Sequence, residues 1–264
     1  MILARLSRAI REQNWFAVAI EFLIVILGVV IGFQVTAWNA EREANARAEV
    51  LTARLIEDLQ DEQWRVIGVT SYYEQVADNA VRALDTLEGR READDRTLVI
   101  EAFRATQIFS FPVIRTTYEE LVSTGTIDLI ADEALIAGAV EYYETGQEEI
   151  SLQNPDRPYR YAFFTLAERD LYDALADQCA EPRTLTIGDF DALPGLLETP
   201  CEIAGHDAAF VRIAQRLRAS ETIRPLLRQR AVEASIESRS QVYWLSLFER
   251  ILPPLDGEVQ TRGE

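Results

Sequence analysis

Histidine, cysteine and lysine, which supply many catalytic and metal sites, are scarce or missing in this chain. Its 264 residues include one histidine and two cysteines, and all 26 basic residues are arginine. We attribute the arginine-only usage to a GC-rich genome. The single histidine, His206, cannot form a multi-histidine metal site, and neither cysteine is spaced from it as zinc ligands are. The sequence therefore predicts no metal site.

The chain also lacks the motifs of common enzymes and cofactor-binding folds. It contains no GxGxxG, no P-loop, no HExxH and no GxSxG, the patterns that hold phosphates, zinc or a nucleophilic serine. Its acidic clusters, such as Asp58, Asp61 and Glu62, lack the residue order and the glycine of a calcium-binding EF-hand. We therefore predict no catalytic residue and no cofactor, and we expect that the protein is not an enzyme.

Positive charge is in deficit. The formal net charge is −18 at pH 7, and a chain this acidic repels nucleic-acid backbones and anionic lipid headgroups. We expect no nucleic acid as a direct partner, whereas basic partners and cations remain open. The hydrophobic fraction of 48% is normal for a folded protein.

One long apolar run dominates the N-terminal region. Residues 15–35 read WFAVAIEFLIVILGVVIGFQV, with Glu21 as the single ionisable side chain. As a helix this run is about 31 Å long, which matches the hydrocarbon core of a bilayer. Trp15 and Trp38 bracket it as interfacial anchors. A cleavable signal peptide, the main alternative, has a shorter apolar region that ends at a small-residue site. The sequence predicts a transmembrane anchor in membrane lipid over residues 15–38.

The orientation of the anchor depends on the flanking segments. Arginines on its two sides are close to a tie in number, so their count alone does not decide. The short basic tail, residues 1–14, favours a cytoplasmic N-terminus. Cys179 and Cys201 close an irregular loop over residues 179–204, which favours a disulfide in an oxidising compartment; two unrelated buried thiols are the alternative. We expect a bacterial inner-membrane protein with a periplasmic C-terminal domain.

Polar and small side chains share one face of the predicted anchor. At about 100° per residue from Glu21, Gly28 and Gly32 lie about 20° to either side and Asn39 returns to zero. A GxxxG pair lets another helix backbone approach closely, and Glu21 in hydrocarbon needs a partner or a route to the headgroups. The sequence predicts a contact along this face with a second copy or with a partner membrane protein. A lipid-facing helix whose Glu21 snorkels to the headgroups is the alternative.

The remaining residues, 39–252, predict a helical extracytoplasmic domain. No proline occurs between Glu41 and Leu87, and apolar residues recur there at helical spacing. The anchor helix should therefore continue to Gly89, with Gly68 as a candidate break. Later helices are expected at about 97–109, from Thr116 or Thr117 to Gly125, and at about 133–153, 156–178, 206–219 and 221–252.

The expected fold is mainly α, with a single N-terminal transmembrane helix continuous with an antiparallel bundle of six to eight helices. Residues 253–264 are predicted to be a disordered tail. Asp94 or Asp95 and Asp132 are predicted helix caps, and Thr116 and Thr117 begin overlapping capping-box patterns.

Two blocks of sequence resemble a bacterial family of unknown function. The first is AIEFLIVILGVVIGFQVTAWNAERE, and the second is TTYEELVSTGTIDLIADEALIAGAVEYYE. They occur in the family's order and cover about a fifth of the chain. Ala40 departs from the pattern, in which an acidic residue follows Trp-Asn. The resemblance implies a one-span anchor with a helical domain, and it implies no activity.

Four residues in and beside the second block, Arg115, Tyr118, Glu119 and Asp128, are a candidate ligand pocket. Tyrosines at 72–73, 142–143, 159 and 161 are candidates for its aromatic walls. The alternative is an ordinary i,i+4 ion pair between Arg115 and Glu119 beside core tyrosines.

The absence of catalytic motifs and the polar face of the anchor together favour a membrane-anchored interaction or scaffold protein. A periplasmic ligand-sensing module is the alternative. Residues 1–14 are too few for an output domain, so such a module would have to signal through a partner membrane protein.

Overall fold

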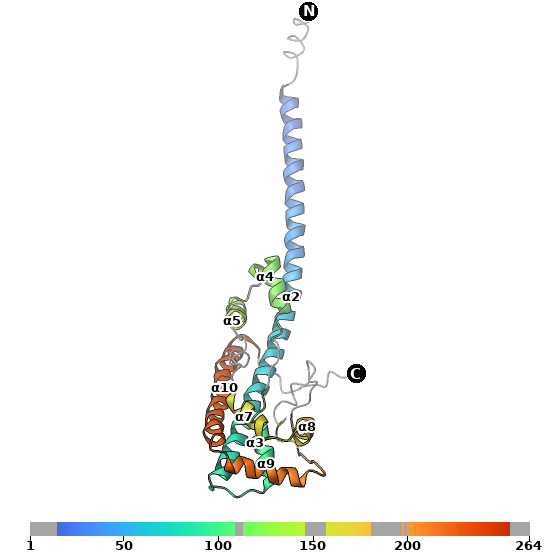
Figure 1. Ribbon diagram of the computed structural model, residues 1–264. Helices are drawn as coiled ribbons and strands as arrows, with labels where there is room; N and C mark the ends of the chain where they lie inside the picture. The colour runs from blue at the N-terminus through green and yellow to red at the C-terminus, as the bar shows by residue number, and fades with distance from the viewer. Residues whose placement is uncertain (1–14, 109–112, 146–156, 181–196, 198–199, 254–264) are drawn as a thin grey trace, which may run out of the picture.

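The computed structural model describes residues 15–108, 113–145, 157–180, 197 and 200–253. These residues form eight α-helices and one 3₁₀ helix, and none of them lies in a strand (Figure 1). The helices are α2 Trp15–Leu87, α3 Asp95–Arg104, α4 Thr116–Thr124, η1 Thr126–Leu129, α5 Glu133–Glu144, α7 Pro158–Leu166, α8 Arg169–Gln178, α9 Asp207–Ala219 and α10 Ile223–Ile251. The predicted mainly α fold is confirmed.

The longest element, α2, has 73 residues and is about 110 Å long at the usual helical rise. Its N-terminal half extends alone, and the other helices gather around its C-terminal half (Figure 1). The predicted break at Gly68 does not occur. A glycine costs a helix only about 1 kcal/mol, and buried Val66 and Val69 hold this part of α2 in the protein core.

The C-terminal half of α2 and the helices packed around it, α3 to α10, are here called the body. It is built on α2 and α10, which run antiparallel. Arg228, near the start of α10, binds Glu88 at the end of α2 with an N–O distance of 2.6 Å. Ser238, further along α10, donates to Glu74, which comes earlier in α2, over 3.4 Å. The later a residue comes in α10, the earlier its partner comes in α2.

Two main apolar cores lie along this helix pair. The proximal core, on the side toward the bare half of α2, takes residues from α2, α4, α5 and the end of α10. It consists of Leu51, Leu55, Leu59, Val66, Tyr118, Leu121, Ile130, Leu135, Ala139, Tyr142, Tyr143, Leu247, Phe248 and Leu252. The distal core lies at the other end and joins α3, α7, α8 and α9, with Phe103, Phe163 and Phe210 at most 1% exposed.

Some predicted helix limits are confirmed and others are wrong. Asp94 caps α3 as expected, since its carboxylate accepts the Thr97 N–H over 2.7 Å, and Asp132 caps α5 over 3.0 Å. However, α3 ends at Arg104 rather than near residue 109. The Phe103 carbonyl accepts hydrogen bonds from the Thr106 hydroxyl and the Gln107 side-chain amide. These side-chain bonds replace the backbone hydrogen bond that a longer helix would make.

The single helix predicted for residues 156–178 is two helices in the described part, α7 and α8. Ala167 and Glu168 between them are extended, with ψ of 139° and 137°. The Glu168 carboxylate accepts two hydrogen bonds from Arg212 of α9, over 2.8 and 2.7 Å. This bend lets Leu171 and Leu175 of α8 enter the distal core.

The segment around α4 and α5 also differs from expectation. Arg115 precedes α4 without a side-chain cap, so the capping boxes at Thr116 and Thr117 are wrong. Gly125 closes α4 as predicted, with the positive φ of 68° that favours glycine. The following residues, Thr126–Leu129, form η1. The described part of α5 ends at Glu144, and the rest of its predicted range, to about residue 153, lies outside the described residues except Thr145.

Truncating the proximal core should destabilise the body. Leu59 is fully buried, so Leu59→Ala should lower the free energy of unfolding by about 2–5 kcal/mol. Urea unfolding in detergent, followed by tryptophan fluorescence, measures this loss. Val81 on the same helix is 45% exposed, and Val81→Ala should lower it by less than about 1 kcal/mol. Equal losses for the two variants would contradict this assignment of the core.

Candidate functional site

Among the described residues, α2 is the one helix that is long and apolar enough to cross a membrane. Its most apolar stretch lies in its N-terminal half, and none of that stretch is buried. Every described side chain from Ala19 to Glu43 is exposed. The bare surface includes Phe22, 66% exposed, and Phe33, 74% exposed. A membrane supplies an apolar medium for such a surface, so this segment is suited to anchoring the protein.

The face predicted to bind another helix is open in the structure. A Cβ added at Gly28 or Gly32 would meet no atom within 4 Å. Thr36 donates its hydroxyl to the Gly32 carbonyl over 2.9 Å, which satisfies that hydroxyl within the helix. Glu21 and Asn39 are exposed on the same helix.

The end of the span is marked by an aromatic ring and a cation. Trp38 is 57% exposed, and the Arg42 guanidinium lies 5.0 Å from the centre of its ring. This arrangement suits the membrane–water interface, where an indole and a basic group meet lipid headgroups. The side chain of Trp15, the other predicted anchor, lies outside the described part.

The residues of the candidate ligand pocket contact one another and Tyr143 in the structure. Arg115 lies 3.5 Å from Glu119 in an i,i+4 ion pair and donates to the Tyr143 carbonyl over 2.8 Å. The ring of Tyr118 stacks on Tyr143 with centroids 4.7 Å apart. Asp128 is exposed on η1. The structure brings Arg115, Tyr118 and Glu119 together around Tyr143, and the pocket stays a prediction.

The tyrosines suggested as pocket walls do not gather at one place. Tyr72 and Tyr73 lie in a small cluster between the two main cores. Tyr159 lies in the distal core, where its hydroxyl donates to the Ala102 carbonyl over 2.7 Å. Tyr142 and Tyr143 alone of these lie beside Tyr118 in the proximal core.

A buried polar network in the proximal core was not predicted from the sequence. Glu62 is fully buried and accepts hydrogen bonds from Arg65 Nε over 2.8 Å, from the Ile114 N–H over 2.9 Å, and from the Tyr142 hydroxyl. Arg65 also donates to the Tyr142 hydroxyl over 2.7 Å. Burial raises the pKa of Tyr142 well above its ordinary value, so the phenol stays neutral. The network fixes α5 and the chain before α4 onto α2.

A second buried network ties α7 and the end of α3 to α10. Glu237 accepts Arg157 on one carboxylate oxygen over 2.7 Å and Arg230 on the other over 3.1 Å. Arg230 also donates to the Ala105 and Gln107 carbonyls over 3.1 and 2.9 Å. The sequence signal available for both networks is a charged residue within an apolar helical stripe.

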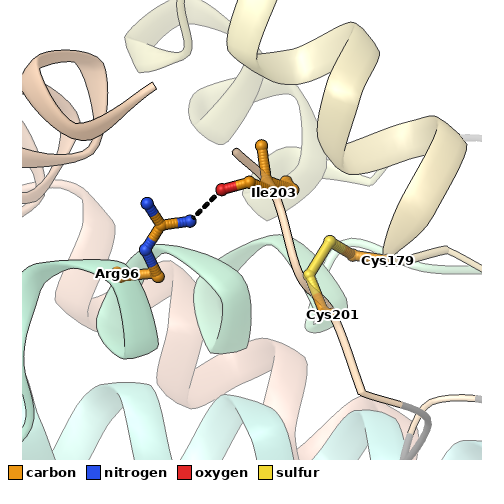
Figure 2. Close-up of a disulfide and its surroundings, with 4 residues drawn as sticks. All are labelled: Arg96, Cys179, Cys201 and Ile203. Carbon is orange, nitrogen blue, oxygen red and sulfur yellow. Dashed lines mark hydrogen bonds between the residues drawn. A yellow bond between two sulfur atoms is a disulfide. The ribbon is translucent and has the colours of Figure 1, made fainter. Parts of the chain in front are cut away.

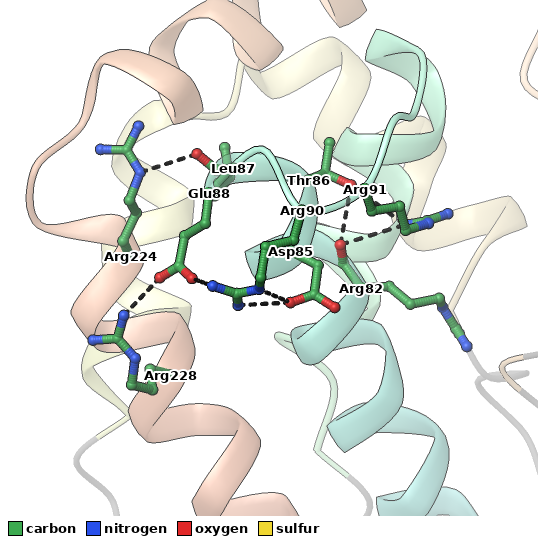
Figure 3. Close-up of polar contacts among 9 residues, drawn as sticks. All are labelled: Arg82, Asp85, Thr86, Leu87, Glu88, Arg90, Arg91, Arg224 and Arg228. Carbon is green, nitrogen blue, oxygen red and sulfur yellow. Dashed lines mark hydrogen bonds and ion pairs between the residues drawn. The ribbon is translucent and has the colours of Figure 1, made fainter.

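The distal end of the body is held by arginines around the turn after α2 (Figure 3). Glu88 binds Arg90 within the turn and Arg228 of α10. Arg224 donates to the Leu87 carbonyl over 3.3 Å. These contacts join the end of α2 to the start of α10, and we assign them a structural role.

Cys179 and Cys201 are joined as a disulfide with Cα atoms 5.0 Å apart (Figure 2). The bridge connects the end of α8 to the segment that leads into α9. Arg96 of α3 holds this segment by donating to the Ile203 carbonyl over 2.6 Å. Residues 181–196 and 198–199 of the loop lie outside the described part.

The chemistry available to a ligand or metal is sparse. His206 precedes α9 as its N-cap residue without a side-chain cap. Within the described ranges, no three histidine, cysteine or acidic side chains could hold a metal ion together.

Comparison with known proteins assigns no family. No family model matches the chain, and no curated protein or solved structure is significantly similar to it.

Removing the carboxylate of the proximal network should be strongly destabilising. Glu62→Gln leaves the buried Arg65 cation without its counter-charge, and we expect a loss of about 3 kcal/mol or more in the free energy of unfolding. Arg47→Ala is the control, because its ion pair with Glu120 is exposed and should contribute less than about 1 kcal/mol. Urea unfolding gives both values, and similar losses for the two variants would contradict the role of this network.

Removing the disulfide should also lower stability. The bridge spans 22 residues in sequence, so Cys179→Ala/Cys201→Ala should lower the free energy of unfolding by about 3 kcal/mol. A reductant should shift the urea midpoint of the native protein and leave that of the double variant unchanged. If the reductant shifts neither, the bridge does not constrain the fold.

Proposed function

We propose that this protein is a single-pass, membrane-anchored interaction or scaffold protein that acts through association of its transmembrane helix. The observation that carries the proposal is the open face of α2, where Gly28 and Gly32 have free space beside them and Glu21 lies on the same side. In lipid, close packing at glycines and pairing of polar groups are the main forces that join helices. Glu21 would find its partner in a neighbouring helix.

The body is rigidly joined to the anchor, so a movement of the anchor would also move the body. No described residue interrupts α2 between the membrane segment and the distal end of the body. The Glu62 network fixes α5 onto the same helix. A rotation or shift of the anchor would therefore move the helices around it as one unit, which is useful in a scaffold.

We further propose that the anchor lies in a bacterial inner membrane, with residues 1–14 in the cytoplasm and the body in the periplasm. The disulfide between Cys179 and Cys201 supports an oxidising compartment for the body. Membership of the bacterial family that the two sequence blocks resemble remains part of this proposal.

A non-enzymatic role fits the same observations. The most strongly buried ionisable groups of the proximal core, Glu62 and Arg65, bond to each other and to Tyr142. The sensing alternative depends on a ligand pocket near Arg115, where the ring of Tyr118 stacks on Tyr143. We therefore rank it second.

Photo-crosslinking along the span tests the proposed association in native membranes. A crosslinking side chain at Val25, beside the glycine face, should give protein adducts, whereas one at Val30, on the opposite face, should give lipid adducts. Gly28→Ile/Gly32→Ile should reduce the protein adducts about tenfold, because the larger side chains hold the backbones apart. Ile26→Leu on the opposite face is the control and should leave them unchanged. Lipid adducts alone from every position would rule the association out.

A further inference from the structure

We propose that the partner of this helix is a second copy of the same chain, bound in parallel through a face that continues beyond the membrane into residues 39–53, here called the stalk. The proposal rests on the proposed function and adds the partner, the register and a contact surface outside the lipid. Three features of the described residues support it: an exposed stripe, the position of the body, and the charges beside the stripe.

The exposed stripe is the extension of the intramembrane face. Counted at about 100° per residue from Glu21, Ala46 lies about 20° to one side, Val50 about 20° to the other and Ala53 about 40° away. All three are exposed, and Val50 is 59% exposed. Two alanines and a valine allow a close approach of helices in water as well as in lipid.

The body lies on the other side of α2 and leaves this stripe free. By the same count, Ala48, Leu51 and Leu55 lie about 120° to 180° from Glu21. They are 4%, 2% and 0% exposed, because the body covers them. Two copies that meet along the stripe would therefore place these buried faces on their outer sides. Glu120 of α4, which binds Arg47 and Arg54 at about 80° and 60° from Glu21, would lie beside the contact. Figure 1 shows the N-terminal half of α2 extending alone from the body.

The charges beside the stripe are complementary in a parallel pair. Arg42 lies about 60° to one side and Glu43 about 40° to the other, and both are exposed. In a parallel two-fold pair, each flank of one helix faces the opposite flank of its partner, so Arg42 of each copy faces Glu43 of the other. Membrane insertion gives both copies the same direction, as this arrangement requires.

The stripe also has a defined end. Asp61 and Trp64, the next residues on this face beyond residue 57, are half-buried, so the body begins to cover the face there. From Glu21 to Ala53 the continuous contact would be about 48 Å long. A steep crossing of the helices at Gly28 and Gly32 would separate the stalks and restrict the contact to the membrane, so the stalk itself is the part to test.

Cysteine crosslinking between two differently tagged copies in native membranes tests the stalk contact. Ala46→Cys and Val50→Cys should each give a disulfide-linked dimer that contains both tags. Asn45→Cys is the matched control, since Asn45 is exposed beside Ala46 but points about 120° away from the stripe. Its crosslinked fraction should be at least about tenfold lower, because a disulfide requires Cα atoms within about 7 Å.

Charge reversal tests the register. Arg42→Glu alone and Glu43→Arg alone place like charges opposite each other, and each should reduce the Ala46→Cys dimer about fivefold. The combined variant restores opposite charges and should return the dimer to within about twofold of the parent. If the combined variant is no better than either single one, the parallel register is overturned.

The outcomes separate this inference from the proposed function. Dimers from Gly32→Cys in the span, without dimers from Ala46→Cys or Val50→Cys, would overturn the stalk contact and leave the membrane association intact. Photo-adducts from Val25 that contain a different protein and no second tag would overturn the second copy as the partner. If neither the span nor the stalk forms any protein adduct, both proposals fail.

Discussion

The structure depends on one constraint, which is that a single unbroken helix must be compatible with two surroundings. Its apolar segment, residues 15–38, presents mostly apolar side chains, as lipid requires. A helix also satisfies its own backbone hydrogen bonds in lipid. The second half of α2 keeps apolar side chains on the faces where α10, α3 and α4 pack. The change occurs at Ala48, the first side chain of α2 that the body buries. The helices of the body pack on α2 only beyond that residue.

Burial of arginine–carboxylate groups gives the body its internal order. Glu62 pairs with the buried Arg65, and Glu237 pairs with Arg157 and Arg230. The bonds of Glu62 to Tyr142 and of Glu237 to Arg157 link segments that are distant in sequence. Arginine cannot lose its proton in a protein, so a misplaced helix would leave a buried charge without a partner. A buried ion pair adds little net stability over a well-packed apolar replacement, but the loss of one partner is strongly destabilising. An ordered body continuous with α2 supports the scaffold role proposed above.

Local chemistry in the sequence anticipated much of the fold. The apolar run, the proline-free stretch after it, and the caps at Asp94 and Asp132 all predicted elements that the structure contains. The break between α7 and α8 was missed because residues 156–178 include no further proline after Pro158 and no glycine. The bend there depends on the partnership of Glu168 with Arg212, which lies 44 residues away. Such a contact leaves no mark on the local pattern.

The candidate sites follow the same division. The face with Glu21, Gly28, Gly32 and Asn39 follows from helical geometry alone, so it was found from the sequence. The Glu62–Tyr142 contact joins residues 80 apart in sequence, so it could not be predicted from the sequence. The residues around Arg115 were recognised as a group, but the ring that packs against Tyr118 became clear only when the fold placed α5 beside α4.

The exposed segment between Trp38 and Ala48 also determines the electrostatics of the anchored protein. Ten residues of helix raise the first buried part of the body about 15 Å above the indole that marks the interface. At physiological ionic strength, charges are screened over about 8 Å. In the proposed membrane arrangement, the acidic body would therefore be held beyond most of the repulsion from anionic headgroups, and its large negative charge would not oppose insertion of the apolar segment.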